Sequence, residues 1–165
     1  MASGDFSVLP SHRVPAHLAR RFHQICLGVT AHVLAHEDLT PKLYGVMAAI
    51  HETPGVSQRQ LAASFGVDQA SLGEMIDELE AKKLVERQID DDDRRARRLR
   101  VTRKGSALRD RLRPDLLAAQ EQILLPLSRT ERKALIDMLV RVLEANDAYA
   151  RPGNGRRKPR KTSQA

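Results

Sequence analysis

Apolar side chains recur at steps of three and four along the first third of the chain, which predicts amphipathic helices. The first helix is expected to run from about Val14 to His36. The second begins after a break, with Thr40 as N-cap and Pro41 at the first helical position, and the Pro54-Gly55 pair is expected to end it.

The same helical spacing returns in the last third of the chain. Thr102 is expected to cap a long helix that Pro114 bends or breaks. A capping box at Ser128 and Glu131 then predicts a final helix to about Tyr149. The residues expected to face inward in this helix are Leu135, Met138, Leu139 and Val142.

Between these regions lie two short helices joined by a tight turn. Ser57 and Gln60 form a capping box for the first, and Gly66 suits its C-terminal end. Asp68 caps the second helix only two residues later. Short helices joined in this way are typical of a helix-turn-helix.

The period of the pattern then changes from helix to strand. "LVERQI" and "RRLRV" both alternate, which predicts two antiparallel strands around the tip "DDDDRR". The fold class expected is mainly α with a small antiparallel β-hairpin, a winged helix-turn-helix with long N- and C-terminal dimerisation helices. The parts are a flexible arm (1–12), a helical dimerisation region (13–38 and 107–150), the winged helix-turn-helix (39–106) and a disordered basic tail (151–165).

The net charge of +7 is concentrated in the tail. Residues 151–165 hold six Lys/Arg and no acid, which leaves 22 bases and 21 acids in the rest of the chain. A nucleic-acid surface on the folded part must therefore depend on where its charges lie. The basic run from Arg94 to Lys104 alternates with Leu99 and Val101, so it predicts a structured basic edge with Arg98 and Arg100 pointing outward.

Several classes of protein are disfavoured by the composition. The chain has no apolar run long enough to span a membrane and no secretory leader, and its single cysteine fits a reducing compartment, so a cytoplasmic location is expected. No phosphate loop, nucleophile elbow or paired-carboxylate motif indicates an enzyme, and no cofactor is expected.

The segment from Leu39 to Gly105 resembles the MarR family of bacterial transcriptional regulators. The wing "DDDDRRARRLRVTRKG" is similar to the family's Asp-x-x-Asp-Arg-Arg segment, and "LAASFGVDQASL" and "DELEAKKLVER" add to the match. Two departures stand out: Glu74 and Glu78 lie where the family often has Arg, and Lys83 where it usually has Gly.

The resemblance implies a homodimer that binds a pseudo-palindromic double-stranded DNA operator. It also implies a repressor released by a small aromatic or phenolic acid, or a related thioester. An architectural DNA-binding protein with little sequence readout, a redox-sensing regulator using Cys26, and a protein-interaction module remain as alternatives.

The residues expected to contact DNA come from three places. The N-terminal end of the second short helix would read bases in the major groove, and the start of the first short helix would bind phosphate. At the wing, Asp90 or Asp93 would hold one of Arg94 and Arg95, and the other arginine would enter the minor groove. The full set is Ser57, Gln58, Arg59, Gln69, Ala70, Ser71, Arg94, Arg95, Arg97 and Arg98.

Other reactive residues carry weaker hypotheses. By analogy with the family, an effector pocket would lie where the first, second and fifth helices meet, with Arg20, His23, His32, Tyr44 and Met47 as its residues. His32 and His36 are spaced for a metal on one helix, but no further ligand completes a set, so no metal is expected. Cys26 lies among apolar neighbours, as an inert thiol does.

Overall fold

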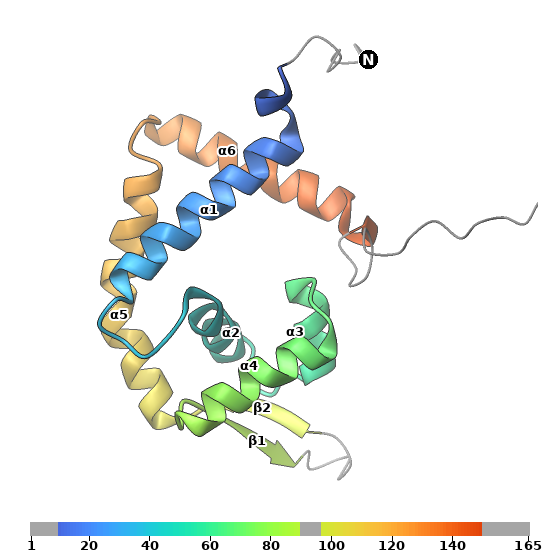
Figure 1. Cartoon of the computed structure of the whole chain (residues 1–165), viewed down its shortest axis with the longest axis vertical. Helices are drawn as coiled ribbons and strands as arrows, with labels where there is room; N and C mark the ends of the chain where they lie inside the picture. The colour runs from blue at the N-terminus through green and yellow to red at the C-terminus, as the bar shows by residue number, and fades with distance from the viewer. Residues whose placement is uncertain (1–9, 90–96, 150–165) are drawn as a thin grey trace, which may run out of the picture.

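The computed structural model describes residues 10–89 and 97–149, and it confirms a mainly helical fold with one two-stranded antiparallel sheet. In Figure 1, α1 and α6 lie at the top, α2, α3, α4 and the β-hairpin form the lower part, and α5 runs along the left side from the hairpin towards α6. The elements are α1 (Pro15–Val33), α2 (Pro41–Glu52), α3 (Gln58–Phe65), α4 (Gln69–Ala81), β1 (Val85–Ile89), β2 (Arg97–Val101), α5 (Arg103–Ile123) and α6 (Arg129–Ala145), with 3-10 turns at Ser11–Arg13 and Asp147–Tyr149.

The helices from α2 to α6 begin where the sequence predicts. In each, a side-chain oxygen of the N-cap accepts a hydrogen bond from the backbone N–H three residues on, and two of these helices have complete capping boxes. Capping satisfies a backbone donor that the helix itself leaves free, and a cap typically contributes about 1 kcal/mol. The five capping residues are Thr40, Ser57, Asp68, Thr102 and Ser128.

Three predicted boundaries differ from the structure. α1 ends at Val33 and not at His36, because Leu34 leaves the helix to pack with Leu112 and Leu116 of α5. α5 continues through Pro114 without a break. Proline removes only one N–H from the ladder, and the position is exposed to solvent. α6 ends at Ala145, four residues before the predicted end.

The main core joins α2, α4 and the hairpin. Val46 and Met47 of α2, Leu72 and Ile76 of α4, and Leu99 of β2 are fully buried in one cluster. This cluster fixes the two short helices and the hairpin as one unit, because each contributes side chains to the same apolar interior. A smaller cluster, formed by Leu34, Leu112 and Leu116, packs α5 against the end of α1.

The prediction that α6 turns its apolar face inward is wrong for the single chain. Met138 and Val142 are 51% and 59% exposed, Leu139 is also exposed, and Leu135 is only partly covered. No core cluster among the described residues includes a residue of α6. A helical period identifies which side chains share a face, but it does not tell which molecule covers that face.

Lys83 is the one residue other than glycine with a positive φ (59°) in the described ranges, 10–89 and 97–149. It follows α4 in a Schellman motif: its N–H donates to Glu80 O (2.8 Å), and the N–H of Leu84 donates to Leu79 O (2.9 Å). For a residue with a Cβ this left-handed conformation costs roughly 1–2 kcal/mol relative to glycine.

We therefore expect Lys83→Gly to raise the free energy of unfolding by about 1 kcal/mol. Urea denaturation followed by circular dichroism measures the change. Lys83→Ala is the control, since it removes the same charge but keeps the Cβ. Equal stability of the Gly and Ala variants would contradict the strain assigned to this position.

Candidate nucleic-acid interface

The N-terminal end of α4 is exposed to solvent. Gln69 and Ala70 are both exposed, whereas Ser71 is half-buried and already hydrogen-bonded. Its hydroxyl donates to Asp68 Oδ2 (2.8 Å) while its backbone N–H donates to Asp68 Oδ1 (2.8 Å). Gln69 and Ala70 are therefore the side chains of this end that are placed to meet a ligand, and Ser71 mainly stabilises the helix start.

Gln58 links the two short helices. Its Nε2 donates to the backbone carbonyl of Gln69 at 3.0 Å. Gly73 makes room for it, because a Cβ there would lie only 3.0 Å from the same nitrogen. This contact holds the start of α3 beside the start of α4, so the two predicted sites lie on neighbouring elements.

The segment before α3 extends the sheet. Gly55 N–H donates to Leu99 O (2.9 Å), Leu99 N–H donates to Val56 O (3.0 Å), and Ser57 forms an isolated bridge with Arg98. The Arg98 side chain is half-buried and donates from Nη1 to the Gly55 carbonyl (3.2 Å), so it points less freely outward than the alternation predicts. The start of α3 is thereby fixed along the basic strand β2.

The charges around these helix ends have both signs. Arg59 of α3 and Arg97 and Arg100 of β2 are exposed cations, and Glu74 and Glu78 are exposed acids of α4. A phosphate backbone would therefore meet its positive partners at α3 and β2 and not along α4. Arg94, Arg95 and the aspartates before them lie outside the described residues.

Sequence reasoning missed a contact between β1 and α4. The Arg87 guanidinium pairs with Asp77 (2.7 Å) and with Glu80, and the Arg87 backbone N–H donates to Glu80 Oε1 (2.8 Å). Arg87 lies on the same side of β1 as buried Val85. A cation at an inward-facing strand position is the signal that predicts an acidic partner on the helix behind it.

A family model described as the MarR family matches residues 37–96, which include α2, α3, α4 and β1. Residues 37–96 of this chain therefore carry the sequence pattern of the MarR family. A relative from Thauera aromatica, named as a transcriptional regulatory protein for the hcr operon, is 34% identical over 106 residues. That alignment covers 64% of this chain and 64% of the relative, so the chain matches slightly less than two thirds of the relative's length.

Two solved structures extend the similarity over most of the chain. PcaV from Streptomyces coelicolor, in complex with its natural ligand, is 27% identical with a TM-score of 0.71, covering 88% of this chain and 99% of its own. CouR, a transcriptional repressor bound to a 23-mer DNA duplex, is 26% identical with a TM-score of 0.72, covering 86% and 97%. The winged-helix arrangement of this chain is thus similar to that of a protein bound to DNA.

The predicted effector residues are dispersed in the structure. A cavity of about 320 Å³ lies between α1, α2 and α5, and of the five residues only Tyr44 lines it. Arg20, His23 and His32 are exposed on α1, and Met47 is fully buried in the core. Arg109 and Arg113 of α5, which the sequence did not single out, line the cavity together with Leu116 and Leu117.

The remaining hypotheses concern histidine and cysteine. His36 lies beyond the end of α1, so it does not share a helix with His32. Within the described ranges no three His, Cys, Asp or Glu side chains gather as a metal site would require. Cys26 is half-buried, and burial raises the pKa of its thiol, which disfavours the reactive thiolate. None of the described helices has the length and apolar character needed to cross a bilayer.

Proposed function

We propose that this protein is a MarR-family transcriptional repressor that binds a pseudo-palindromic DNA operator as a homodimer and is released by a small aromatic acid or its thioester. The observation that carries the proposal is the grouping of three elements. The exposed start of α4, the start of α3 and the basic strand β2 are joined by direct hydrogen bonds. The same fold holds DNA in CouR.

Each element has a distinct role in this proposal. Gln69 and Ala70 enter the major groove, where an amide can pair with adenine and a methyl group can contact thymine. Arg59 and Arg97 bind phosphates on either side. Gln58 and Arg98 hold the elements together through their hydrogen bonds with Gln69 and Gly55, and Ser57 caps α3 through Gln60.

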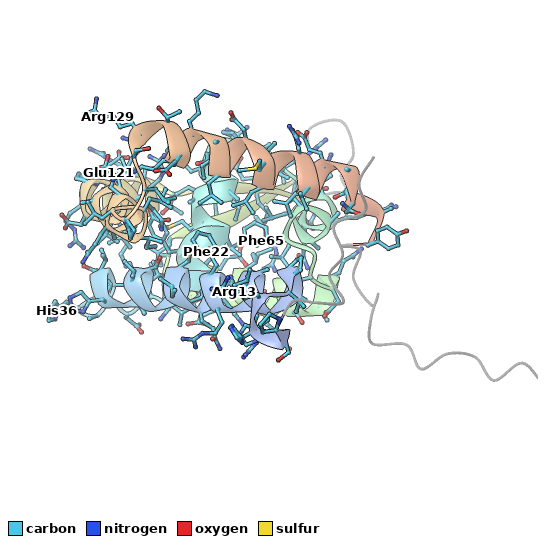
Figure 2. The ribbon with its side chains drawn as sticks, turned by 90° about the horizontal axis from the view of Figure 1, so that it is seen from above. Arg13, Phe22, His36, Phe65, Glu121 and Arg129 are labelled. Atoms are coloured by element: carbon cyan, nitrogen blue, oxygen red, sulfur yellow. The ribbon has the colours of Figure 1, made fainter. Side chains whose placement is uncertain are left out.

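The homodimer is supported by apolar surface that the single chain leaves open. Besides α6, α1 exposes Leu18 (51%) and Ile25 (48%). Figure 2 shows α1 and α6 as two long, separate helices, with the labelled Phe22 on α1. Contiguous apolar surface of this kind marks an interface, and a second copy supplies a matching face.

The effector site is supported by the cavity between α1, α2 and α5. Arg113 lines it, and its side chain makes no hydrogen bond or ion pair with any residue in the described ranges. Burial raises the pKa of the Tyr44 phenol, which keeps its O–H available as a donor. A guanidinium and a phenol over the apolar Leu116 and Leu117 suit an aromatic carboxylate.

The proposal is tested by titrating the protein against labelled DNA from upstream of its own gene, with random DNA as competitor at near-physiological salt. A specific regulator keeps its binding in the presence of the competitor. A variant that ends at residue 150 is measured alongside, and it should keep the operator preference while losing salt-sensitive affinity. Binding that disappears with the tail would favour an architectural protein.

Arg94→Ala and Arg95→Ala are expected to weaken operator binding, with a loss of roughly 1–3 kcal/mol for the arginine that enters the groove. The measurement is the same titration with each variant. Arg129→Ala, at the exposed start of α6, serves as the control for removing an arginine elsewhere. If both wing variants bind as the parent does, the wing has no role in DNA binding.

A further inference from the structure

A second cavity, of about 790 Å³, lies between the end of α4, the first half of α5 and the turn from α1 to α2. It shares no lining residue with the cavity at Tyr44. We call it the α4–α5 pocket. Its apolar lining includes Leu39, Leu84 and Leu108, which also belong to or pack against the main core.

Four cations and two acids surround this apolar lining. Arg111 forms a two-point pair with Glu37 (2.8 and 3.0 Å), and Lys82 pairs with Asp38 at 2.6 Å. The hydrogen bond from Arg111 lowers the pKa of the Glu37 carboxyl, and the one to Asp38 raises the pKa of the Lys82 ammonium, so Glu37 and Lys82 both stay charged near neutral pH.

The other two cations have no acidic partner among the residues that the structure describes. Lys104 Nζ donates to the backbone carbonyl of Lys82 (2.9 Å) and pairs with no carboxylate of the described chain. The Lys83 side chain makes no hydrogen bond or ion pair within residues 10–89 and 97–149. The pocket therefore keeps two uncompensated positive charges beside an apolar surface.

Lys83 also occupies its position in a strained conformation. Its φ of 59° is one that glycine adopts without cost, as Gly66 does at the end of α3. A side chain kept in such a conformation at a cavity is a reason to look for a ligand that it binds. The strain and the missing partner are independent observations on the same residue.

We propose that the α4–α5 pocket binds an amphipathic anion, with an apolar ring against Leu84 and Leu108 and a carboxylate or phosphate held by Lys83 and Lys104. The bound anion lies next to Lys82 and Arg111 and competes with Asp38 and Glu37 for them. Those two acids join the α1–α2 turn to α4 and to α5, so binding loosens the connection between the turn and the end of α4.

The test is a fluorescence titration with 2-naphthoate and 2-naphthyl phosphate at pH 7, with neutral 2-naphthol as the comparison. The chain has no Trp, so the naphthyl signal is read with little protein background. Saturable binding of either anion, with at least fivefold weaker binding of naphthol, is expected. Tighter binding of the phosphate ester would identify a phosphate ligand, and tighter binding of naphthoate a carboxylate.

The decisive variants are Lys83→Gly and Lys104→Met. Each is expected to weaken anion binding roughly two- to fivefold, and the double variant about tenfold, as expected for ion pairs near a surface. Lys83→Gly is expected to relieve strain and raise the stability of the fold, so weaker binding in this variant would not be a sign of unfolding. Lys104→Met removes the charge but keeps an unbranched side chain of similar length at this lining position.

Lys42→Met is the matched control, since it removes an exposed lysine of α2 that lines neither of these two cavities. It is expected to bind both anions as the parent does. If Lys83→Gly and Lys104→Met bind both anions as the parent does, if only Arg113→Gln, in the cavity beside Tyr44, lowers the affinity, or if naphthol binds as well as the anions, the proposal is wrong.

Discussion

Gly105→Ala is expected to destabilise the fold by about 3 kcal/mol or more. Gly105 lies in the first turn of α5, where it is buried next to Leu84, which precedes β1, and Val101, the last residue of β2. A Cβ there would come within 2.7 Å of Val101 Cγ1 and still closer to the carbonyl oxygen of Leu84. That carbonyl also accepts the backbone N–H of Thr102 (3.0 Å), so it cannot move without breaking the start of α5.

Urea denaturation measures this loss, with Gly28→Ala as the matched control. Gly28 is in α1, and a Cβ there would have nothing within 4 Å. In a helix the same substitution is then expected to be neutral or to stabilise by up to about 1 kcal/mol. A Gly105→Ala variant as stable as the parent would mean that Leu84 and α5 separate easily.

The double substitution Leu139→Glu with Val142→Glu is expected to convert the proposed dimer into a monomer and to weaken binding to the proposed operator at least about a hundredfold. Both residues lie on the exposed apolar face of α6. Charges buried in an apolar interface are costly, and a monomer loses the gain from engaging two half-sites at once. Light scattering gives the mass, and the operator titration gives the affinity.

Val140→Glu is the matched control for these substitutions. It lies two residues from Val142 on the other side of α6 and is also exposed. It should remain dimeric and keep its DNA affinity. A double variant that stays dimeric would place the interface elsewhere, and a monomer that still binds the operator tightly would show that one half-site suffices.

The local chemistry of the helices could be read directly from the sequence. Five N-caps, the glycine after α3 and both strands depend on residues within a few positions of one another, and the structure confirms them. The end of α1 could not be read in this way, because it depends on Leu34 meeting α5 nearly eighty residues later. Continuity through Pro114 likewise reflects tertiary packing that outweighs one lost hydrogen bond.

The candidate site was predictable to a lesser extent. The sequence places Gln69 and Ala70 at a helix start, and the structure shows them exposed there. It does not indicate that Gln58 holds α3 to α4, or that Arg87 pairs with Asp77 across two elements. The residues in these contacts are not related by the spacing of a helix or a strand, so the sequence pattern does not predict the contacts and only the folded structure shows them. The individual DNA contacts stay predictions.

The strand-like pairing of Gly55–Ser57 with β2 has a consequence for how such a protein can respond to a signal. Because the start of α3, the wing strand and α4 are cross-linked by hydrogen bonds, they are already ordered before any partner arrives. Little conformational entropy is then lost when DNA binds. In the proposed dimer, a signal is therefore transmitted most easily as a change in the distance between the two winged-helix units, while the shape of each unit stays the same.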